Sequence, residues 1–268
     1  MRTRAPWSAA VALLVAGTLV GCTAPEPLAS SRPVSATPDG PTSVSIEGSL
    51  TAADLDVLSA TRFFFAHRSV GASILEVGIP AVYESLGVSL GTGDQSPFID
   101  YWLEQTDDPT AKIREFEATI RAMTATELPD VALLKIGYID VWSGTDTARL
   151  FETYVTSMTG LETDFPGVVF LHSTVSVTGW NPEDNVAIER LNAAMRDRYA
   201  ASGHLYDIAT IVSTCMDGRT NVASTADGQT YYSICPEFTE DGGHLSLIGA
   251  ERAATELLRI AAIAARSQ

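Results

Sequence analysis

Residues 62–71 read RFFFAHRSVG, and this stretch decides how the chain folds. Its largely apolar run, residues 62–66, is typical of a strand that is buried on both faces of a parallel sheet. The run is followed at once by a polar turn that carries Ser69 and Gly71. An α/β enzyme places reactive side chains in the turns that follow its strands, so we identify Ser69 as a candidate nucleophile.

The rest of the domain alternates between short apolar runs and helical patterns. Strands are predicted over residues 62–66, 87–90, 131–136, 168–172 and 204–208. Helices are predicted over residues 70–86, 110–125, 147–163, 182–201 and 246–265, the first with a break at Gly78 and Pro80. This alternation predicts an α/β fold of three layers, in which a five-stranded, mostly parallel sheet has the flavodoxin-like strand order 2-1-3-4-5.

The N-terminus has the pattern of a lipoprotein signal peptide. Arg2 and Arg4 precede an apolar run, residues 9–20, that closes on Cys22. The run is shorter than a membrane span needs, so cleavage before Cys22 and lipid attachment to its thiol are favoured over a retained transmembrane anchor. We therefore expect a signal peptide over residues 1–21, a tether rich in Pro, Ser and Thr over residues 22–49, and one domain over residues 50–268.

The charge balance excludes one class of partner. The chain holds 17 basic and 33 acidic residues, and loss of a signal peptide with Arg2 and Arg4 moves the net charge from −16 to −18. A nucleic-acid-binding surface needs the opposite sign, so nucleic acid is not an expected partner. The membrane is an expected partner through a lipid on Cys22, which places the chain outside the cytoplasm and anchored to a bacterial-type membrane.

Two further cysteines, Cys215 and Cys235, lie in a stretch that reads as loop. Outside the cytoplasm such a pair is expected to form a disulfide, and the alternative is two unrelated buried thiols. The pair lacks the close Cys or His spacing of a zinc site, and the other histidines follow no ligand pattern. We expect no metal and no cofactor.

The loops that follow the predicted strands carry the candidate chemistry, because ligands in open parallel sheets bind beyond the carboxyl ends of the strands. Ser69 follows the first strand, and Gly91 and Gly93 follow the second. Asp241 and His244 come from the far end of the chain, just before the last helix. A serine needs a base to take its proton, and an aspartate that orients this base completes the arrangement.

The C-terminal stretch DGGHLSLIGAERAATELL, residues 241–258, resembles the closing block of the SGNH (GDSL-like) hydrolases, in which a D-x-x-H pair precedes the last helix. This family has a flavodoxin-like sheet and a nucleophilic serine just after the first strand. The resemblance implies that Ser69 is the nucleophile, His244 the base and Asp241 its orienting partner. It also implies an oxyanion hole built from the backbone N–H groups of Ser69 and of Gly91 or Gly93.

The chain departs from the family at two places. His67 and Arg68 replace the glycine and aspartate before the serine, and Ile139 stands where the family has an asparagine that donates to the oxyanion. Loss of one such donor lowers the rate roughly 10²- to 10³-fold unless another group, such as Tyr138, replaces it. The residues expected to contact substrate are His67, Arg68, Tyr138 and His172.

The resemblance implies a membrane-tethered serine esterase that acts on a small-molecule or glycan ester, with an O-acetylated carbohydrate as one substrate class. Ile139 favours a second hypothesis of another class. In that hypothesis the chain is a degenerate, lipid-anchored relative that binds a glycan or cell-wall ligand and catalyses no reaction.

Overall fold

Five parallel strands form the central sheet, in the order β2-β1-β3-β4-β5. They are β1 (Phe63–His67), β2 (Phe98–Trp102), β3 (Val131–Leu134), β4 (Val169–Ser173) and β5 (Leu205–Tyr206). The computed structural model describes residues 49–106 and 108–267, which belong to one unit, Val44–Gln268. The predicted strand order 2-1-3-4-5 is confirmed.

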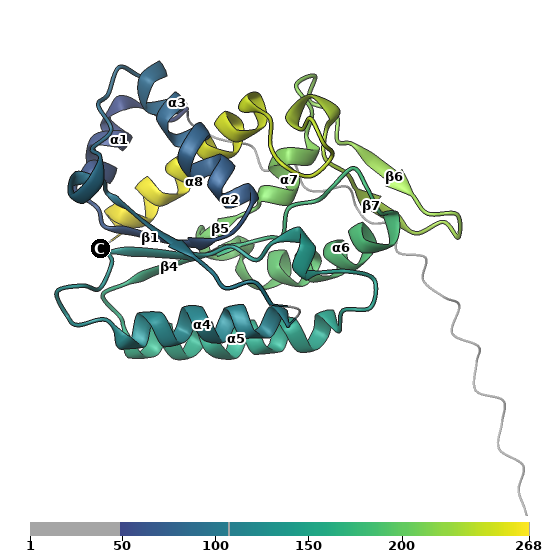
Figure 1. Ribbon diagram of the computed structural model, residues 1–268, viewed down its shortest axis with the longest axis horizontal. Coiled ribbons are helices and arrows are strands. Elements are labelled where there is room, and N and C mark those ends of the chain that lie inside the picture. The colour runs from purple at the N-terminus through teal and green to yellow at the C-terminus, as the bar shows by residue number, and fades with distance from the viewer. Residues whose placement is uncertain (1–48, 107, 268) are drawn as a thin grey trace, which may run out of the picture. The chain divides into compact units, whose positions relative to one another are not determined.

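Helices cover both faces of the sheet and complete three layers (Figure 1). One layer holds α4 (Pro109–Ala122), α5 (Thr147–Asp164) and α6 (Pro182–Tyr199). The other layer holds α1 (Ala52–Ser59), α2 (Val70–Ala72), α3 (Ile79–Ser85), α7 (Ile208–Ser213) and α8 (Leu247–Arg266). The three-layer α/β architecture predicted from the alternation of patterns is confirmed.

Strand β1 lies second from one edge of the sheet, and all five of its residues are buried. Phe64 faces α4, where its ring lies 6.0 Å from that of Phe116, while Phe63 lies 5.7 Å from Phe98 of β2. A strand with apolar residues on both faces has to be covered on both sides. The FFF run therefore places β1, and the turn after it, inside the three-layer stack.

The predicted second strand, residues 87–90, is wrong. These residues form no strand, and the second strand is β2, which pairs with β1 at the sheet edge from Phe63↔Phe98 onward. An edge strand is covered less completely, and in β2 only Phe98 is buried, while half-buried and exposed residues alternate after it. Gly91 and Gly93 therefore precede β2 and lie toward the amino end of the strands, away from the edge that carries Ser69.

The chain after Ser69 is helical without interruption as far as Ser85. The predicted break at Gly78 and Pro80 is a π-helical segment, Ser73–Gly78, which joins α2 to α3. Pro80 lies in the first turn of α3, directly after the π-helical segment, where the backbone hydrogen-bond pattern changes from i→i+5 to i→i+4. A Cβ on Gly78 would lie 2.2 Å from the Ala250 carbonyl oxygen, so glycine allows this segment to pack directly on α8.

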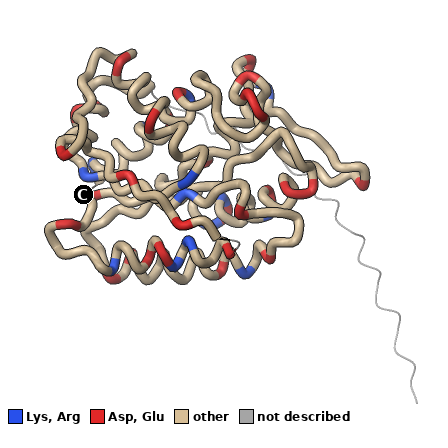
Figure 2. The backbone as a smooth tube through the Cα atoms, viewed as in Figure 1, with Lys and Arg blue, Asp and Glu red and all other residues tan. Residues whose placement is uncertain are grey.

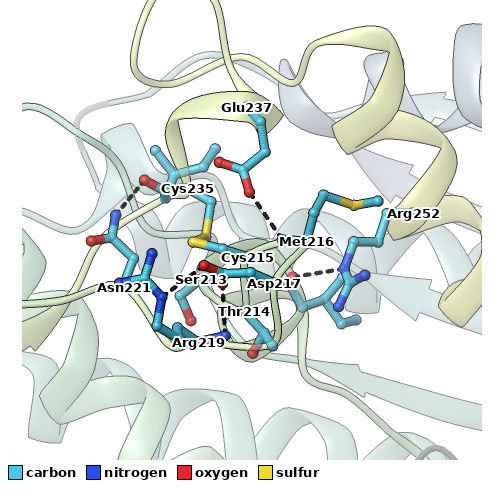
Figure 3. Close-up of a disulfide and its surroundings, with 12 residues drawn as sticks. Ser213, Thr214, Cys215, Met216, Asp217, Arg219, Asn221, Cys235, Glu237 and Arg252 are labelled. Atoms are coloured by element: carbon cyan, nitrogen blue, oxygen red, sulfur yellow. Dashed lines mark hydrogen bonds and ion pairs between the residues drawn. A yellow bond between two sulfur atoms is a disulfide. The ribbon is translucent and has the colours of Figure 1, made fainter.

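A disulfide joins Cys215 and Cys235, whose Cα atoms lie 5.4 Å apart, as predicted (Figure 3). It ties the end of α7 to the segment that leads to Asp241, and the Cys235 N–H reinforces the link with a 2.9 Å bond to the Val212 carbonyl. Glu237 lies close enough to both sulfurs for a shared metal ion, but disulfide sulfurs are not the thiolates that bind zinc.

Two smaller features were not predicted. An antiparallel hairpin, β6 (Val222–Ser224) and β7 (Thr230–Tyr232), stands beside α6 (Figure 1). The fifth strand is only two residues long, and α7 begins at Ile208, where the sequence indicated continued strand.

The acidic residues are spread along the helices and loops, with basic residues interspersed among them (Figure 2). None of the helices within the described ranges is long and apolar enough to cross a bilayer. The predicted signal peptide, Cys22 and all but the last residue of the tether fall on residues 1–48, outside the described residues.

Candidate active site

Ser69 occupies a constrained turn between β1 and α2. Its backbone has φ 51° and ψ −109°, and among the described residues no other side-chain-bearing residue has a positive φ. Residues in this region cost on the order of 1–3 kcal/mol and are often found at active sites. The turn is tight because Gly71 packs on His67, where a Cβ would lie 2.4 Å from the ring. The sequence Ser-Val-Gly therefore fits a sharp strand-to-helix turn with the serine at its apex.

His244 and Asp241 form a hydrogen-bonded pair on the loop before α8. His244 Nδ1 lies 2.6 Å from Asp241 Oδ2, and Asp241 Oδ1 accepts the backbone N–H groups of Gly243 and His244 at 2.8 Å each. The bond to the His244 ring and these two backbone bonds hold the pKa of Asp241 well below its usual value. Asp241 is thus ionised at neutral pH and fixes the imidazole through Nδ1, which leaves Nε2 free.

Tyr138 lies next to both the serine and the histidine. Its ring approaches that of His244 edge-on, at 6.3 Å between centroids, and that of Trp180 at 5.4 Å. Burial raises the pKa of the Tyr138 hydroxyl, and an interaction with the Ser69 side chain partly opposes this rise. The Ser69 Oγ is itself buried and makes no hydrogen bond of good distance and angle. The phenol therefore stays protonated beside an unengaged serine oxygen.

Ser69, Tyr138 and His244 share one cavity of about 760 Å³. Further residues in its wall come from the loops after β1, β2, β3 and β4 and from the start of α6: Arg68, Gln105, Lys135, Ile139, Trp142, Thr178, Trp180 and Asp184. The cavity thus lies at the carboxyl edge of the sheet, where the parallel topology directs ligands. A volume of this size suits a small-molecule ligand.

The two predicted oxyanion glycines are not at this cavity. Gly91 and Gly93 precede β2, and neither is among the residues of the cavity wall. The loop that does follow β2 contributes Gln105 and Thr106 instead. Ile139 lies in the wall, with 70% of its side chain exposed, and it has no polar group to offer an oxyanion.

Of the predicted substrate contacts, Arg68 and Tyr138 line the cavity, and His67 and His172 do not. His67 points inward from β1, is fully buried and bonds Asp100 through Nε2 at 2.9 Å. His172 stacks on Tyr199 at 3.6 Å on the opposite face of the sheet. Neither histidine belongs to the cavity wall, because each side chain is buried against its own face of the sheet.

A buried ion pair supports the loop after β3. Lys112 of α4 lies 2.6 Å from Asp140 Oδ1, and the two side chains are 2% and 3% exposed. Asp140 Oδ2 also accepts the Gly137 N–H at 2.9 Å. Asp140 therefore fixes the turn that presents Tyr138 and Ile139 to the cavity.

Lys135, Asp184 and Gln105 belong to the cavity wall but were not singled out from the sequence. Lys135 could have been noticed, because it directly follows the apolar run VALL and is one of only two lysines in the chain. Asp184 and Gln105 carry no such signal, since a polar residue in a loop or at a helix start is usually solvated.

Comparisons with known proteins bear on the fold. No family model matches the chain, and no curated protein matches it in sequence. A solved structure described as a "putative platelet activating factor" from Streptococcus pneumonia is similar at 13% identity, with 76% of this chain and 88% of that chain covered and a TM-score of 0.50.

Two further similar structures are a GDSL-like lipase from Bacteroides thetaiotaomicron and a catalytic mutant of an acetylxylan esterase from Geobacillus stearothermophilus. The lipase has 11% identity, coverage of 76% and 87%, and a TM-score of 0.48. The esterase has 13% identity, coverage of 75% and 93%, and a TM-score of 0.43. At such low sequence identities, structural similarity is evidence for the fold alone. With its strand order β2-β1-β3-β4-β5, a serine turn after β1 and an Asp-x-x-His loop before the last helix, the chain has a GDSL-like hydrolase fold.

Proposed function

We propose that the protein is a serine esterase tethered outside the cytoplasm, which cleaves small-molecule or glycan esters such as O-acetyl groups on a carbohydrate. The observation that carries this proposal is that Ser69 and His244 line one cavity, that both lie next to Tyr138, and that His244 is bonded to Asp241. A nucleophile, a base and a group that orients the base are the three parts that acyl transfer requires.

In the proposed reaction Ser69 Oγ attacks the acyl carbonyl while His244 Nε2 takes the hydroxyl proton. Asp241 holds the imidazole by Nδ1 and stabilises the imidazolium that forms. His244 then gives the proton to the leaving alcohol, and water resolves the acyl-enzyme by the same steps in reverse. The backbone N–H of Ser69 is one donor to the oxyanion.

The Tyr138 hydroxyl is the second proposed oxyanion donor, in place of the asparagine that the family carries at the position of Ile139. Its raised pKa keeps the proton on the phenol, and its interaction with Ser69 supports a position near the attacked carbonyl. Tyr138→Phe removes this donor and keeps the ring contacts with Trp180 and His244. We expect it to lower kcat roughly 10²- to 10³-fold with little change in KM.

Labelling with a fluorophosphonate probe tests the nucleophile. Wild-type protein should be labelled and should hydrolyse p-nitrophenyl acetate, and Ser69→Ala should do neither. Ser85→Ala is a matched control, because Ser85 is an exposed serine at the end of α3 that only bonds the Val82 carbonyl. Labelling that survives in Ser69→Ala would refute the assignment of the nucleophile.

The proposed lipid anchor rests on the sequence around Cys22, and the Cys215–Cys235 disulfide supports an oxidising compartment. Cys22→Ala should move the protein from the membrane fraction to the soluble fraction. An unchanged distribution in cell fractionation would contradict the anchor.

A second candidate function is the binding of a glycan without catalysis. Ile139 favours it, and so do two half-exposed indoles of the cavity wall, Trp142 and Trp180, because aromatic rings can stack on sugars. In that case the fluorophosphonate probe and p-nitrophenyl esters should give no reaction, whereas cell-wall oligosaccharides should quench the tryptophan fluorescence.

A further inference from the structure

Lys135 is the most unusual charged group of the cavity. It directly follows β3, the residue is 1% exposed, and its Nζ has no hydrogen-bond partner among residues 49–106 and 108–267. A buried ammonium without a partner is costly, because it has lost its hydration and gained no compensating bond. Buried charges in proteins are therefore paired, unless a ligand provides the missing partner.

The other charged groups of the cavity already have partners. Lys112 is paired with Asp140, Arg68 donates to the Leu103 carbonyl at 2.7 Å, and Asp184 accepts the Ser143 N–H at 2.7 Å. Asp241 holds His244. The cavity consequently has one buried cation, Lys135, whose charge no direct bond compensates.

The choice of residue is also informative. Lys112 and Lys135 are the only lysines in the chain, and the remaining 15 basic residues are all arginines. Both lysines are buried in the wall of this one cavity, in a protein of net charge −16. One of these ammonium groups is therefore paired with Asp140, and the other is unpaired in the wall of the same cavity.

We propose that the Lys135 ammonium binds an anionic group of the ligand, so that the cavity selects compounds bearing a carboxylate or a phosphate ester. We take this anion to be part of the ester substrate, so the assignment rests on the proposed function to that extent. An unpaired ammonium acts as a point charge and donates hydrogen bonds to either group. A charge-assisted bond of this type contributes roughly 1.5–3 kcal/mol in general, or about 10- to 150-fold in affinity.

The electrostatic surroundings of Lys135 are compatible with this role. Burial lowers the pKa of Lys135 to about 8, with Asp140 opposing the change and Lys112 adding to it. Burial also lowers the pKa of the neighbouring His67, which favours the neutral form of its ring. At pH 6.5 the ammonium is therefore the protonated form that an anion requires.

The presence of two lysines makes a direct test possible. Lysine labelled with ¹³C at Cε and ¹⁵N at Nζ gives two NMR signals, and Lys135→Met identifies that of Lys135. At pH 6.5 we titrate the labelled chain with sodium butyrate, with methyl phosphate, with the neutral isostere butyramide and with sodium chloride. We expect a saturable shift of the Lys135 signal with butyrate or methyl phosphate, and none with butyramide or with chloride at equal ionic strength.

The relative affinities for the two anions distinguish the two ligand classes. Tighter binding of butyrate indicates a ligand with a carboxylate, and tighter binding of methyl phosphate indicates a phosphate ester. Quenching of the cavity tryptophans gives the affinity in the variants, where Lys135→Met should bind the anion at least about tenfold more weakly than wild type. Arg219→Met is the control, because it also removes one positive charge but its side chain is 86% exposed.

No saturable shift, a shift of equal size with chloride, or equal binding by Lys135→Met and wild type would overturn the proposal. The titration of the wild-type chain needs neither a folded variant nor turnover. Anion binding without hydrolysis would refute the esterase and leave the anion site intact, whereas hydrolysis without anion binding would do the reverse.

Discussion

Two aspartate pairs stand at the carboxyl edge of the sheet, and they differ in burial rather than in length. Lys112–Asp140 and His244–Asp241 are both 2.6 Å apart, but the side chains of the first are 2% and 3% exposed and those of the second 53% and 51%. A buried charge left alone is strongly destabilising, whereas an exposed pair contributes little to folding. The first pair therefore stabilises the folded structure, and the second is available for the proposed ester hydrolysis.

Asp241→Asn tests the exposed His244–Asp241 pair and should give the largest effect of the variants described below. An asparagine keeps the backbone bonds but permits the wrong imidazole tautomer, so kcat/KM should fall about 10⁴-fold. The free energy of unfolding should change by less than about 1 kcal/mol. Ester hydrolysis and urea unfolding measure the two quantities. Asp217→Asn, which disrupts the exposed 2.7 Å pair with Arg219, is the control. A large loss of stability in Asp241→Asn would remove the contrast between the pairs.

Lys112→Met tests the buried Lys112–Asp140 pair. It leaves the carboxylate of Asp140 buried without its cation and should lower the free energy of unfolding by about 3–5 kcal/mol. Arg121→Met is the matched control, because the Arg121–Asp164 pair has the same 2.6 Å separation with side chains 38% and 51% exposed. That control should cost less than about 1 kcal/mol in urea unfolding. Equal losses in the two variants would show that burial is not the deciding variable.

A double variant sharpens the interpretation. Lys112→Met combined with Asp140→Asn removes the uncompensated charge but keeps an acceptor for the Gly137 N–H. It should recover about 1–3 kcal/mol of the stability that Lys112→Met loses. If the double variant is less stable than Lys112→Met by the full cost of Asp140→Asn alone, the two side chains are not coupled.

The smallest expected effect is the pH dependence of the exposed pair. The pKa of Asp241 is lower in the folded chain than the ordinary value of an aspartate, so its contribution to stability is present above that ordinary value and is lost as the pH falls below it. The contribution should remain below about 1 kcal/mol, since solvent screens a half-exposed group. Urea unfolding at pH 7, 5 and 3 should show wild type and Asp241→Asn converging toward pH 3. A constant difference would contradict this.

The fold was largely predictable because most of its signals are local. The FFF run, the alternation of strands with amphipathic helices and the Asp-x-x-His loop before α8 each depend on neighbouring residues. The edge strand β2 is missed because only one side of it is covered, so that Asp100 and Trp102 are exposed, whereas Val88 and Leu90 have the spacing of a strand. That single error moved Gly91 and Gly93 to the wrong end of the sheet.

Of the candidate site, only the positions of Ser69, Asp241 and His244 could be predicted from the sequence. The positions of Ser69, Asp241 and His244 follow from the topology once the strand order is known. Which way a strand histidine points depends on register, so His67 and His172 read like rim residues although both are buried. The unpaired state of Lys135 depends on contacts with α4 and with the loop after β3, which lie outside its own sequence neighbourhood.

The positive φ of Ser69 has a consequence for how this protein would respond to selection. A glycine tolerates that backbone conformation without cost, so Ser69→Gly should raise the free energy of unfolding, by on the order of 1 kcal/mol, while it removes the proposed nucleophile. Directed evolution for heat resistance alone would therefore favour the inactive chain. Any thermostable variant of this protein has to be screened for ester hydrolysis at each round.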